Sequence, residues 1–271
     1  MEMSPTKMPP SGMGIVPPQY TMTTMITTLI HGRTATPSRL SNATGLFFSH
    51  SGRTYLVTSR HVLIDEEERY YPDSIEIRVH TDAQDISKNR EVELPLYESG
   101  KPLWLEHPTR GSAVDLVVLS VEETLPKDAR INYWTAKDFL PIDKRLPVGA
   151  HLSVIGYPLG FYDIENNLPM VRQAGLASIY QSDFRGNPFF LIDASLHEGT
   201  SGSPVITTTP RTIMDDKFSI IMGWGPPFLL GVNSGEFPDS KLTSFLGLHK
   251  VWYPYLITDI IDRTEKGWNQ G

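Results

Sequence analysis

One segment near residue 200 restricts the fold of this chain more than any other part of the sequence. An apolar stretch enters it over residues 190–192, two glycines bracket a serine over residues 199–202, and Pro204 begins a second apolar stretch. Glycine adopts a positive φ at little steric cost, so the pattern predicts a tight loop between two β-strands. There, Gly199 can turn its own N–H and that of Ser201 into one cavity, and Gly202 leaves room for another backbone. An ordinary turn would explain Gly-x-Ser-Gly alone.

Short apolar segments separated by turn residues recur along the rest of the chain, which is typical of an all-β protein. Residues 74–80 alternate between apolar and polar side chains, and residues 91–97 do much the same, as expected for half-buried strands. Further strands are expected at residues 20–29, 45–48, 55–58, 103–105, 112–121, 148–158, 173–179, 218–222 and 229–235. Residues 252–261 have helical spacing instead. Residues 1–19 are rich in proline and lack any period, which indicates a mobile tail.

Composition excludes several classes of function. The 271 residues contain no cysteine, so a disulfide framework, a thiolate zinc site and a cysteine nucleophile are excluded, and a reducing compartment fits. A formal net charge of −7 argues against nucleic acid as a partner, because phosphate binding relies on clustered lysine and arginine. No apolar run reaches the roughly 18 residues that span a bilayer. We therefore expect a soluble, cytoplasmic protein without a membrane partner.

A serine hydroxyl becomes a strong nucleophile only when a base removes its proton, so a serine site needs a histidine and a group that orients it. Among the eight histidines, His61 is distinctive because it follows a predicted hairpin over residues 45–58 and precedes an apolar residue. Asp115 stands at the mouth of the otherwise apolar segment 112–121. An isolated buried carboxylate is costly unless it is paired, and the imidazole of His61 would be its natural partner.

These three segments resemble the signature segments of trypsin-like serine peptidases. Residues 199–204 (Gly-Thr-Ser-Gly-Ser-Pro) are similar to the nucleophile loop Gly-Asp/Asn-Ser-Gly-Gly-Pro, and residues 58–61 to the Thr/Ala-x-x-His signature. Residues 115–119 look like the Asp-Ile/Leu-Ala-Leu-Leu segment. The order His61, Asp115, Ser201 is also the trypsin-like order. The chain departs from the pattern at Thr200 and Ser203, and neither departure removes a group needed for catalysis.

The resemblance implies a serine endopeptidase that needs no cofactor and no metal. Ser201 would be the nucleophile, His61 the general base and later the general acid, and Asp115 the residue that holds the Nδ1 proton of His61. The amides of Gly199 and Ser201 would form the oxyanion hole. The implied fold is all-β, with two six-stranded antiparallel β-barrels (chymotrypsin-like) and a C-terminal helix.

The resemblance also divides the chain into parts. Residues 1–19 would form the tail, residues 20–125 a first barrel with His61 and Asp115, and residues 126–147 the connection. Residues 148–248 would form a second barrel with Ser201, and residues 249–271 the C-terminal helix and tail. Residues 148–160 and 173–179, together with Asp193, are similar to the bacterial HtrA-like branch of the family. No residues are left for the PDZ domain of HtrA itself.

The substrate implied by the resemblance is a polypeptide bound in extended form, as an added strand along Val232, Asn233 and Ser234. Ser195, six residues before the nucleophile, would form the floor of the pocket for the side chain that precedes the scissile bond, with Val232 and Asn233 on its wall. A neutral floor predicts an uncharged substrate residue, since a buried cation would lack a counter-charge. Asp193 or Glu198 could still reach the pocket and reverse this preference.

Other interpretations stay open. The same fold could bind a peptide or partner protein without catalysis, if Thr200 or Ser203 disturbs the oxyanion geometry. An unrelated all-β interaction domain could use its Gly and Ser loops as turns, and an esterase would use the same acyl transfer. The carboxylates of residues 65–68 fit a solvated loop better than a divalent cation site. The small size suggests limited processing of a partner protein, and a partner could also regulate the activity.

Overall fold

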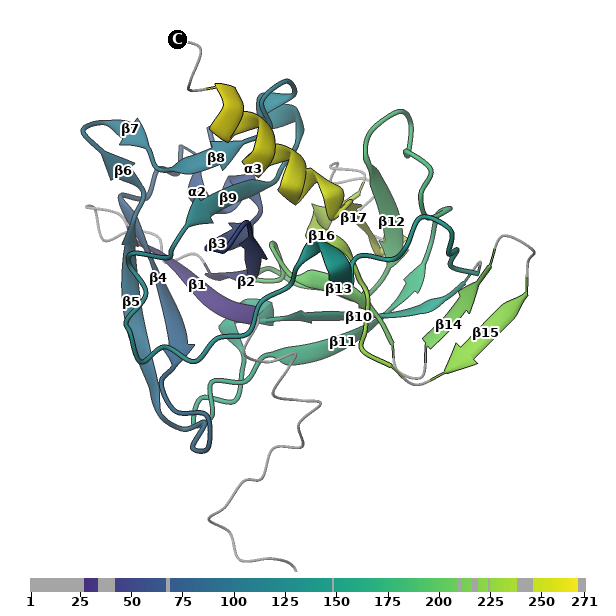
Figure 1. Ribbon diagram of the computed structural model, residues 1–271, viewed down its shortest axis with the longest axis horizontal. Helices are drawn as coiled ribbons and strands as arrows, with labels where there is room; N and C mark the ends of the chain where they lie inside the picture. The colour runs from purple at the N-terminus through teal and green to yellow at the C-terminus, as the bar shows by residue number, and fades with distance from the viewer. Residues whose placement is uncertain are drawn as a thin grey trace, which may run out of the picture.

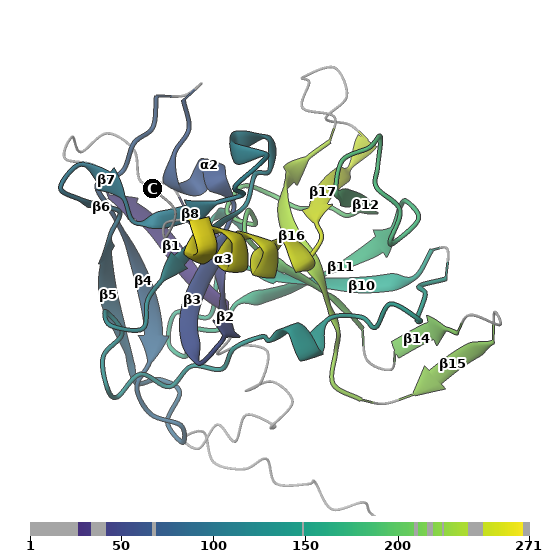
Figure 2. The same ribbon diagram turned by 45° about the horizontal axis from the view of Figure 1, so that its top comes forward.

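The computed structural model describes residues 27–33, 42–66, 69–147, 149–208, 211–215, 219–223, 225–237 and 246–267. The protein is mostly β, with two β units side by side, one from the first half of the chain and one from the second (Figure 1). A helix near the C-terminus lies across the junction of the two units (Figure 1, Figure 2). The predicted tail and most of the predicted strand at residues 20–29 lie outside the described residues.

The first unit is built on a seven-stranded sheet with the strand order β5-β4-β1-β2-β3-β9-β8. Its members are β1 (Thr27–Arg33), β2 (Asn42–His50), β3 (Arg53–Thr58), β4 (Ser74–His80), β5 (Asn89–Pro95), β8 (Trp104–Glu106) and β9 (Val117–Ser120). Neighbouring strands pair antiparallel. Smaller elements join them, namely α2 (Arg60–Leu63), β6 (Tyr97–Glu98), β7 (Lys101–Pro102), η1 (Gly111–Ala113) and η2 (Ala136–Asp138).

The second unit is a closed barrel with the strand order β10-β11-β12-β17-β16-β13. Its members are β10 (His151–Gly156), β11 (Met170–Leu176), β12 (Phe189–Asp193), β13 (Pro204–Thr207), β16 (Leu229–Glu236) and β17 (Leu248–Trp252). A one-turn helix, η3 (Pro158–Gly160), follows β10, and a hairpin of β14 (Arg211–Met214) and β15 (Ile220–Gly223) projects from the barrel (Figure 1). The predicted strand, tight loop and strand around residue 200 correspond to β12, the loop and β13.

A shared hydrophobic core joins the two units. Val114, Leu116 and Val118 of the first unit belong to the same buried cluster as Phe189 and Leu191 of the second. The C-terminal helix α3 (Tyr255–Gly267) closes this cluster with four fully buried aliphatic side chains, those of Leu256, Ile257, Ile260 and Ile261. Burial of such a side chain stabilises a fold by about 1.5–3 kcal/mol, so α3 fixes one unit against the other. The units can therefore hold a site between them in one geometry.

The prediction of two six-stranded barrels is met in the second unit only. In the first unit the described residues form a sheet whose outer strands, β5 and β8, do not pair with each other. Barrel closure requires strand tilt and register to match around the whole sheet, and β8 has only three residues to pair. The predicted boundary at residues 248 and 249 also differs, because β17 is a strand of the closed barrel.

Candidate active site

His61 and Asp115 come from separate parts of the first unit and meet at its edge. His61 lies in α2, whose Val62 and Leu63 are buried and so fix the position of this short helix. Asp115 precedes β9, between the fully buried side chains of Val114 and Leu116. Oδ1 of the Asp115 carboxylate accepts a hydrogen bond from the backbone N–H of His61 at 2.9 Å. Oδ2 of the same carboxylate lies 2.7 Å from Nδ1 of the His61 imidazole. This two-point contact fixes both the position and the rotation of the imidazole.

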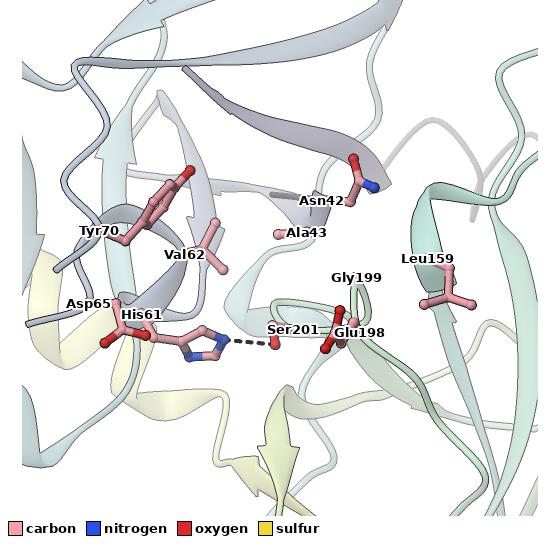
Figure 3. Close-up of a pocket in the computed structure, with 10 residues that line it drawn as sticks. All are labelled: Asn42, Ala43, His61, Val62, Asp65, Tyr70, Leu159, Glu198, Gly199 and Ser201. Atoms are coloured by element: carbon pink, nitrogen blue, oxygen red, sulfur yellow. Dashed lines mark hydrogen bonds between the residues drawn. The ribbon is translucent and has the colours of Figure 1, made fainter. Parts of the chain in front are cut away.

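Ser201 reaches the other side of the same imidazole from the second unit. Its Oγ lies 2.9 Å from Nε2 of His61 (Figure 3). Its carbonyl accepts the N–H of Thr44 at 2.9 Å, and the neighbouring Gly202 N–H donates to the Asn233 carbonyl at 2.7 Å. The structure thus brings the three predicted residues into one hydrogen-bonded line, although they come from distant parts of the chain.

Charge and burial act in opposite directions on the pKa values of His61 and Asp115. Burial opposes the charged form of His61, but its hydrogen bond to Asp115 and the charges of Asp115 and Asp65 outweigh burial, and the pKa of His61 is raised above 6.5. Burial also opposes ionisation of Asp115, but contacts with His61 keep the pKa of that carboxyl below its ordinary value. The result is a charged carboxylate beside an imidazole with a strong affinity for a proton, as general base catalysis requires.

The loop before Ser201 presents two free amides. Gly199 has a φ of +90°, and a Cβ built there would lie 2.4 Å from the carbonyl oxygen of Tyr157, so only glycine fits. The Leu159 N–H donates to the Glu198 carbonyl at 2.6 Å. The C=O and N–H of a trans peptide point in opposite directions, so this bond turns the Gly199 N–H away from Leu159. Among the described residues, no acceptor takes the N–H of Gly199 or Ser201.

Thr44 holds this loop from the first unit. Its fully buried hydroxyl donates to the Gly199 carbonyl at 2.7 Å and accepts the Tyr157 N–H at 3.1 Å. One side chain therefore links β2, the end of β10 and the loop before the nucleophile. Thr44 was not predicted to act in the site, because a threonine just before the strand expected at residues 45–48 carries no local sign of such a role.

The predicted substrate residues of β16 are placed differently from the expected wall of a pocket. The Val232 side chain is fully buried in the shared core. Asn233 is also fully buried, and its Nδ2 donates to the Thr200 carbonyl at 2.9 Å, so it supports the nucleophile loop. The buried Ser234 hydroxyl accepts the indole N–H of Trp252 at 3.0 Å. These side chains therefore serve the interior, and the backbone of Val232 and Asn233 is already paired with β17 and with residues 202–204, so a substrate strand could meet β16 only past Asn233.

Ser195 lies outside the pocket next to Ser201. It is exposed, and its carbonyl accepts a hydrogen bond from Arg172 at 2.7 Å. Asp193 is exposed as well, whereas Glu198 does line that pocket. The expectation that Ser195 forms the floor of a pocket for the residue before the scissile bond stays a prediction.

The two departures from the family's loop sequence are accommodated in different ways. Thr200 folds back on its own loop, where its hydroxyl donates to the His197 carbonyl at 2.7 Å. Ser203 is fully buried and its hydroxyl has no hydrogen-bond partner. Neither side chain blocks the line from Asp115 to Ser201.

A pocket of about 330 Å³ opens beside the nucleophile. Figure 3 draws the residues that line it, among them His61, Ser201 and Gly199. Asn42, Tyr70 and Leu159 complete its walls from segments that are far apart in the sequence. These three residues were not predicted to lie in the site, since nothing in their local patterns indicates that they converge.

The carboxylate-rich segment after α2 serves as an ion-pairing loop as far as it is described. Glu66 accepts two hydrogen bonds from the guanidinium of Arg60, at 2.9 and 2.7 Å. Residues 67 and 68 lie outside the described residues. Within the described ranges, no group of three or more His, Cys, Asp or Glu side chains could hold a metal ion. The same part of the chain has no helix with the length and hydropathy needed to cross a membrane.

Residues 43–213 match the family model of a trypsin-like peptidase domain. Among solved structures, an inactive mutant form of Rv3671c from M. tuberculosis shares 16% sequence identity with this chain. The match includes 95% of this chain and 94% of the Rv3671c chain, and its TM-score is 0.50. A serine endoprotease from Yersinia pestis shares 19% sequence identity. The match includes 90% of this chain and 65% of the Yersinia chain, and its TM-score is 0.51. Likeness at these identities shows the fold alone. No curated protein gives a significant sequence match.

Proposed function

Because the chain belongs to the trypsin-like peptidase family, we propose that it is a serine endopeptidase that acts through Ser201, His61 and Asp115. The observation that supports this most strongly is the continuous hydrogen-bonded line from the Asp115 carboxylate through both ring nitrogens of His61 to the Ser201 hydroxyl. Each group in that line lies within the distance at which a proton can be transferred or held.

In the proposed cycle, His61 takes the proton of Ser201 while Oγ bonds to the carbonyl carbon of the scissile peptide. The oxygen that becomes negative accepts hydrogen bonds from the N–H groups of Gly199 and Ser201. The imidazolium, stabilised by Asp115, then gives its proton to the departing amine nitrogen as the C–N bond breaks. Water, deprotonated by His61, attacks the acyl-enzyme, and Ser201 recovers its proton as the second product leaves.

The proposed substrate is a polypeptide in extended form whose acyl side lies beside the backbone of β16, through β-augmentation. We retain limited processing of a partner protein as the proposed physiological task. We propose a cytoplasmic location for it, with which the lack of cysteine is compatible.

Labelling with a fluorophosphonate tests the proposal directly, because only an activated serine reacts. We expect the native protein to be labelled and the Ser201→Ala variant to stay unlabelled. Ser203→Ala is the matched control, since it removes a neighbouring hydroxyl that lies outside the hydrogen-bonded line. Hydrolysis of a quenched peptide library would accompany labelling. A protein that binds peptides without any labelling would be a catalytically silent member of the family, and labelling with ester hydrolysis alone would indicate an esterase.

A further inference from the structure

Two carboxylates in the pocket beside Ser201 have no part in the proposed cycle. Asp65 follows α2, and Glu198 immediately precedes Gly199. Both line the pocket, and Figure 3 shows Asp65 next to His61 and Glu198 next to Ser201, at the two ends of the catalytic hydrogen bond. A ligand that enters this pocket therefore meets a negative charge on each side of the nucleophile.

Both carboxylates stand on backbone that is held in place. Asp65 and Tyr70 exchange two backbone hydrogen bonds, at 3.0 and 2.8 Å, which close the loop between them. The Glu198 carbonyl is held by the Leu159 N–H at 2.6 Å. A charge on a fixed backbone loses less entropy when it binds a partner, so the two residues are prearranged for recognition.

The described lining of the pocket contains no lysine or arginine. Arg60, the neighbour of His61, is bound by Glu66 at 2.7 Å and by Glu106 at 3.1 Å. Lys250 lies on β17 and is not a lining residue. The charge of Lys250 nevertheless acts on His61 and Asp115, so the pocket's own contribution is the two carboxylates of its described lining.

The rest of the lining is apolar or aromatic. Val62 and Ala43 are almost fully buried beneath the pocket, Tyr70 forms one wall, and the exposed Leu159 forms another. Apolar walls with carboxylates beside them match a side chain that has a long aliphatic stem and a cationic head. Lysine and arginine are the natural side chains with this construction.

The position of the pocket tells which part of a substrate would enter it. In the proposed function the acyl side of the substrate runs beside β16, and no residue of β16 lines the described pocket. His61, which gives its proton to the departing amine, does line it. The pocket therefore lies on the leaving-group side of Ser201.

We propose that this pocket receives the substrate residue that follows the scissile bond, and that Asp65 and Glu198 make lysine or arginine the preferred residue there. This inference rests on the proposed peptidase function. It adds a specificity on the leaving-group side, which is independent of the residue before the scissile bond.

Quenched peptides that differ only at the residue after the scissile bond test the inference. We expect kcat/KM to be about tenfold higher with lysine than with glutamate at low salt, since each partly exposed ion pair contributes only modestly. The preference should shrink at high salt, because screening weakens exposed charge pairs. In the double variant Asp65→Asn/Glu198→Gln it should fall to about twofold or less.

A matched control removes the same charge elsewhere. Glu98 and Glu123 are exposed and lie outside the pocket, so Glu98→Gln/Glu123→Gln should keep the full preference for lysine. Equal turnover of the lysine and glutamate peptides by the native protein would overturn the inference. So would a preference that the control variant loses as strongly as the pocket variant does.

Binding to the Ser201→Ala variant separates this inference from the proposed function. A peptide that begins with lysine, which corresponds to the departing product, should bind this variant more tightly than its glutamate counterpart, by about tenfold. Tighter binding without fluorophosphonate labelling of the native protein would retain the pocket and refute the peptidase. Labelling with equal binding and equal turnover would retain the peptidase and refute the pocket.

Discussion

The hydroxyl of Thr44 is predicted to control the shape of the oxyanion loop. Thr44→Val removes the hydroxyl and keeps the size and branching of the side chain, so β2 should pair as before. The change leaves two buried groups without a partner, the Gly199 carbonyl at 2.7 Å and the Tyr157 N–H at 3.1 Å. The Gly199 carbonyl belongs to the peptide that follows the proposed oxyanion donor, the Gly199 N–H. Tyr157 lies two residues before Leu159, whose N–H binds the Glu198 carbonyl.

The magnitude follows from these two bonds. Each buried group left unsatisfied costs about 1–3 kcal/mol, so Thr44→Val should lower the free energy of unfolding by about 2–6 kcal/mol. Loss of an oxyanion donor lowers kcat by about 10²–10³-fold, and a displaced donor retains part of its effect. We therefore expect kcat to fall by up to about a hundredfold.

The assay combines urea unfolding with steady-state hydrolysis of one quenched peptide. Thr44→Ser is the control, because it keeps the hydroxyl and loses only a methyl group, at a cost of about 1 kcal/mol. Its kcat should stay close to that of the native protein. If the valine and serine variants have the same stability and the same kcat, the hydroxyl does not hold the loop and the reasoning is wrong.

Two further predictions concern pH and backbone space. The general base must be neutral and the pKa of His61 is raised, so kcat/KM should fall as the pH decreases, with a midpoint above 6.5. The charge of Asp65 contributes to the raised pKa, so Asp65→Asn should move the midpoint to lower pH. An unmoved midpoint would contradict this role of the Asp65 charge. Gly202→Ala should abolish fluorophosphonate labelling, since a Cβ there would lie 1.9 Å from the Thr44 carbonyl oxygen. The control Gly52→Ala has a similar positive φ but open space, so it should cost only about 1 kcal/mol in stability, measured by urea unfolding.

Local patterns in the chain were sufficient for many of the secondary structure elements. β4 occupies the residues 74–80 whose alternation predicts a strand, and α3 overlaps the segment with helical spacing. The strands β14 and β17 were not predicted. β17 becomes a strand through its pairing with β12 on one side and β16 on the other, which are contacts that its own short sequence does not encode.

Closure of the sheets is likewise a property of the whole molecule. The second unit closes because β13 pairs with β10 and β17 pairs with β12, in each case between segments distant in the sequence. In the first unit β5 and β8 do not pair in this way within the described ranges. Such pairing depends on tilt and register summed over all strands, so a pattern of short apolar segments predicts the strands and not their closure.

The three catalytic candidates could be named from the primary structure, because the short segments around His61, Asp115 and Ser201 resemble signature segments of trypsin-like peptidases. The tertiary structure alone decided what surrounds them. Thr44 reaches Gly199 and Tyr157 only after the two β units have packed on a shared core, and its role depends on which atoms then lie within about 3 Å of each other. No local pattern carries that information, since the Thr44–Gly199 and His61–Ser201 contacts each join residues more than a hundred positions apart.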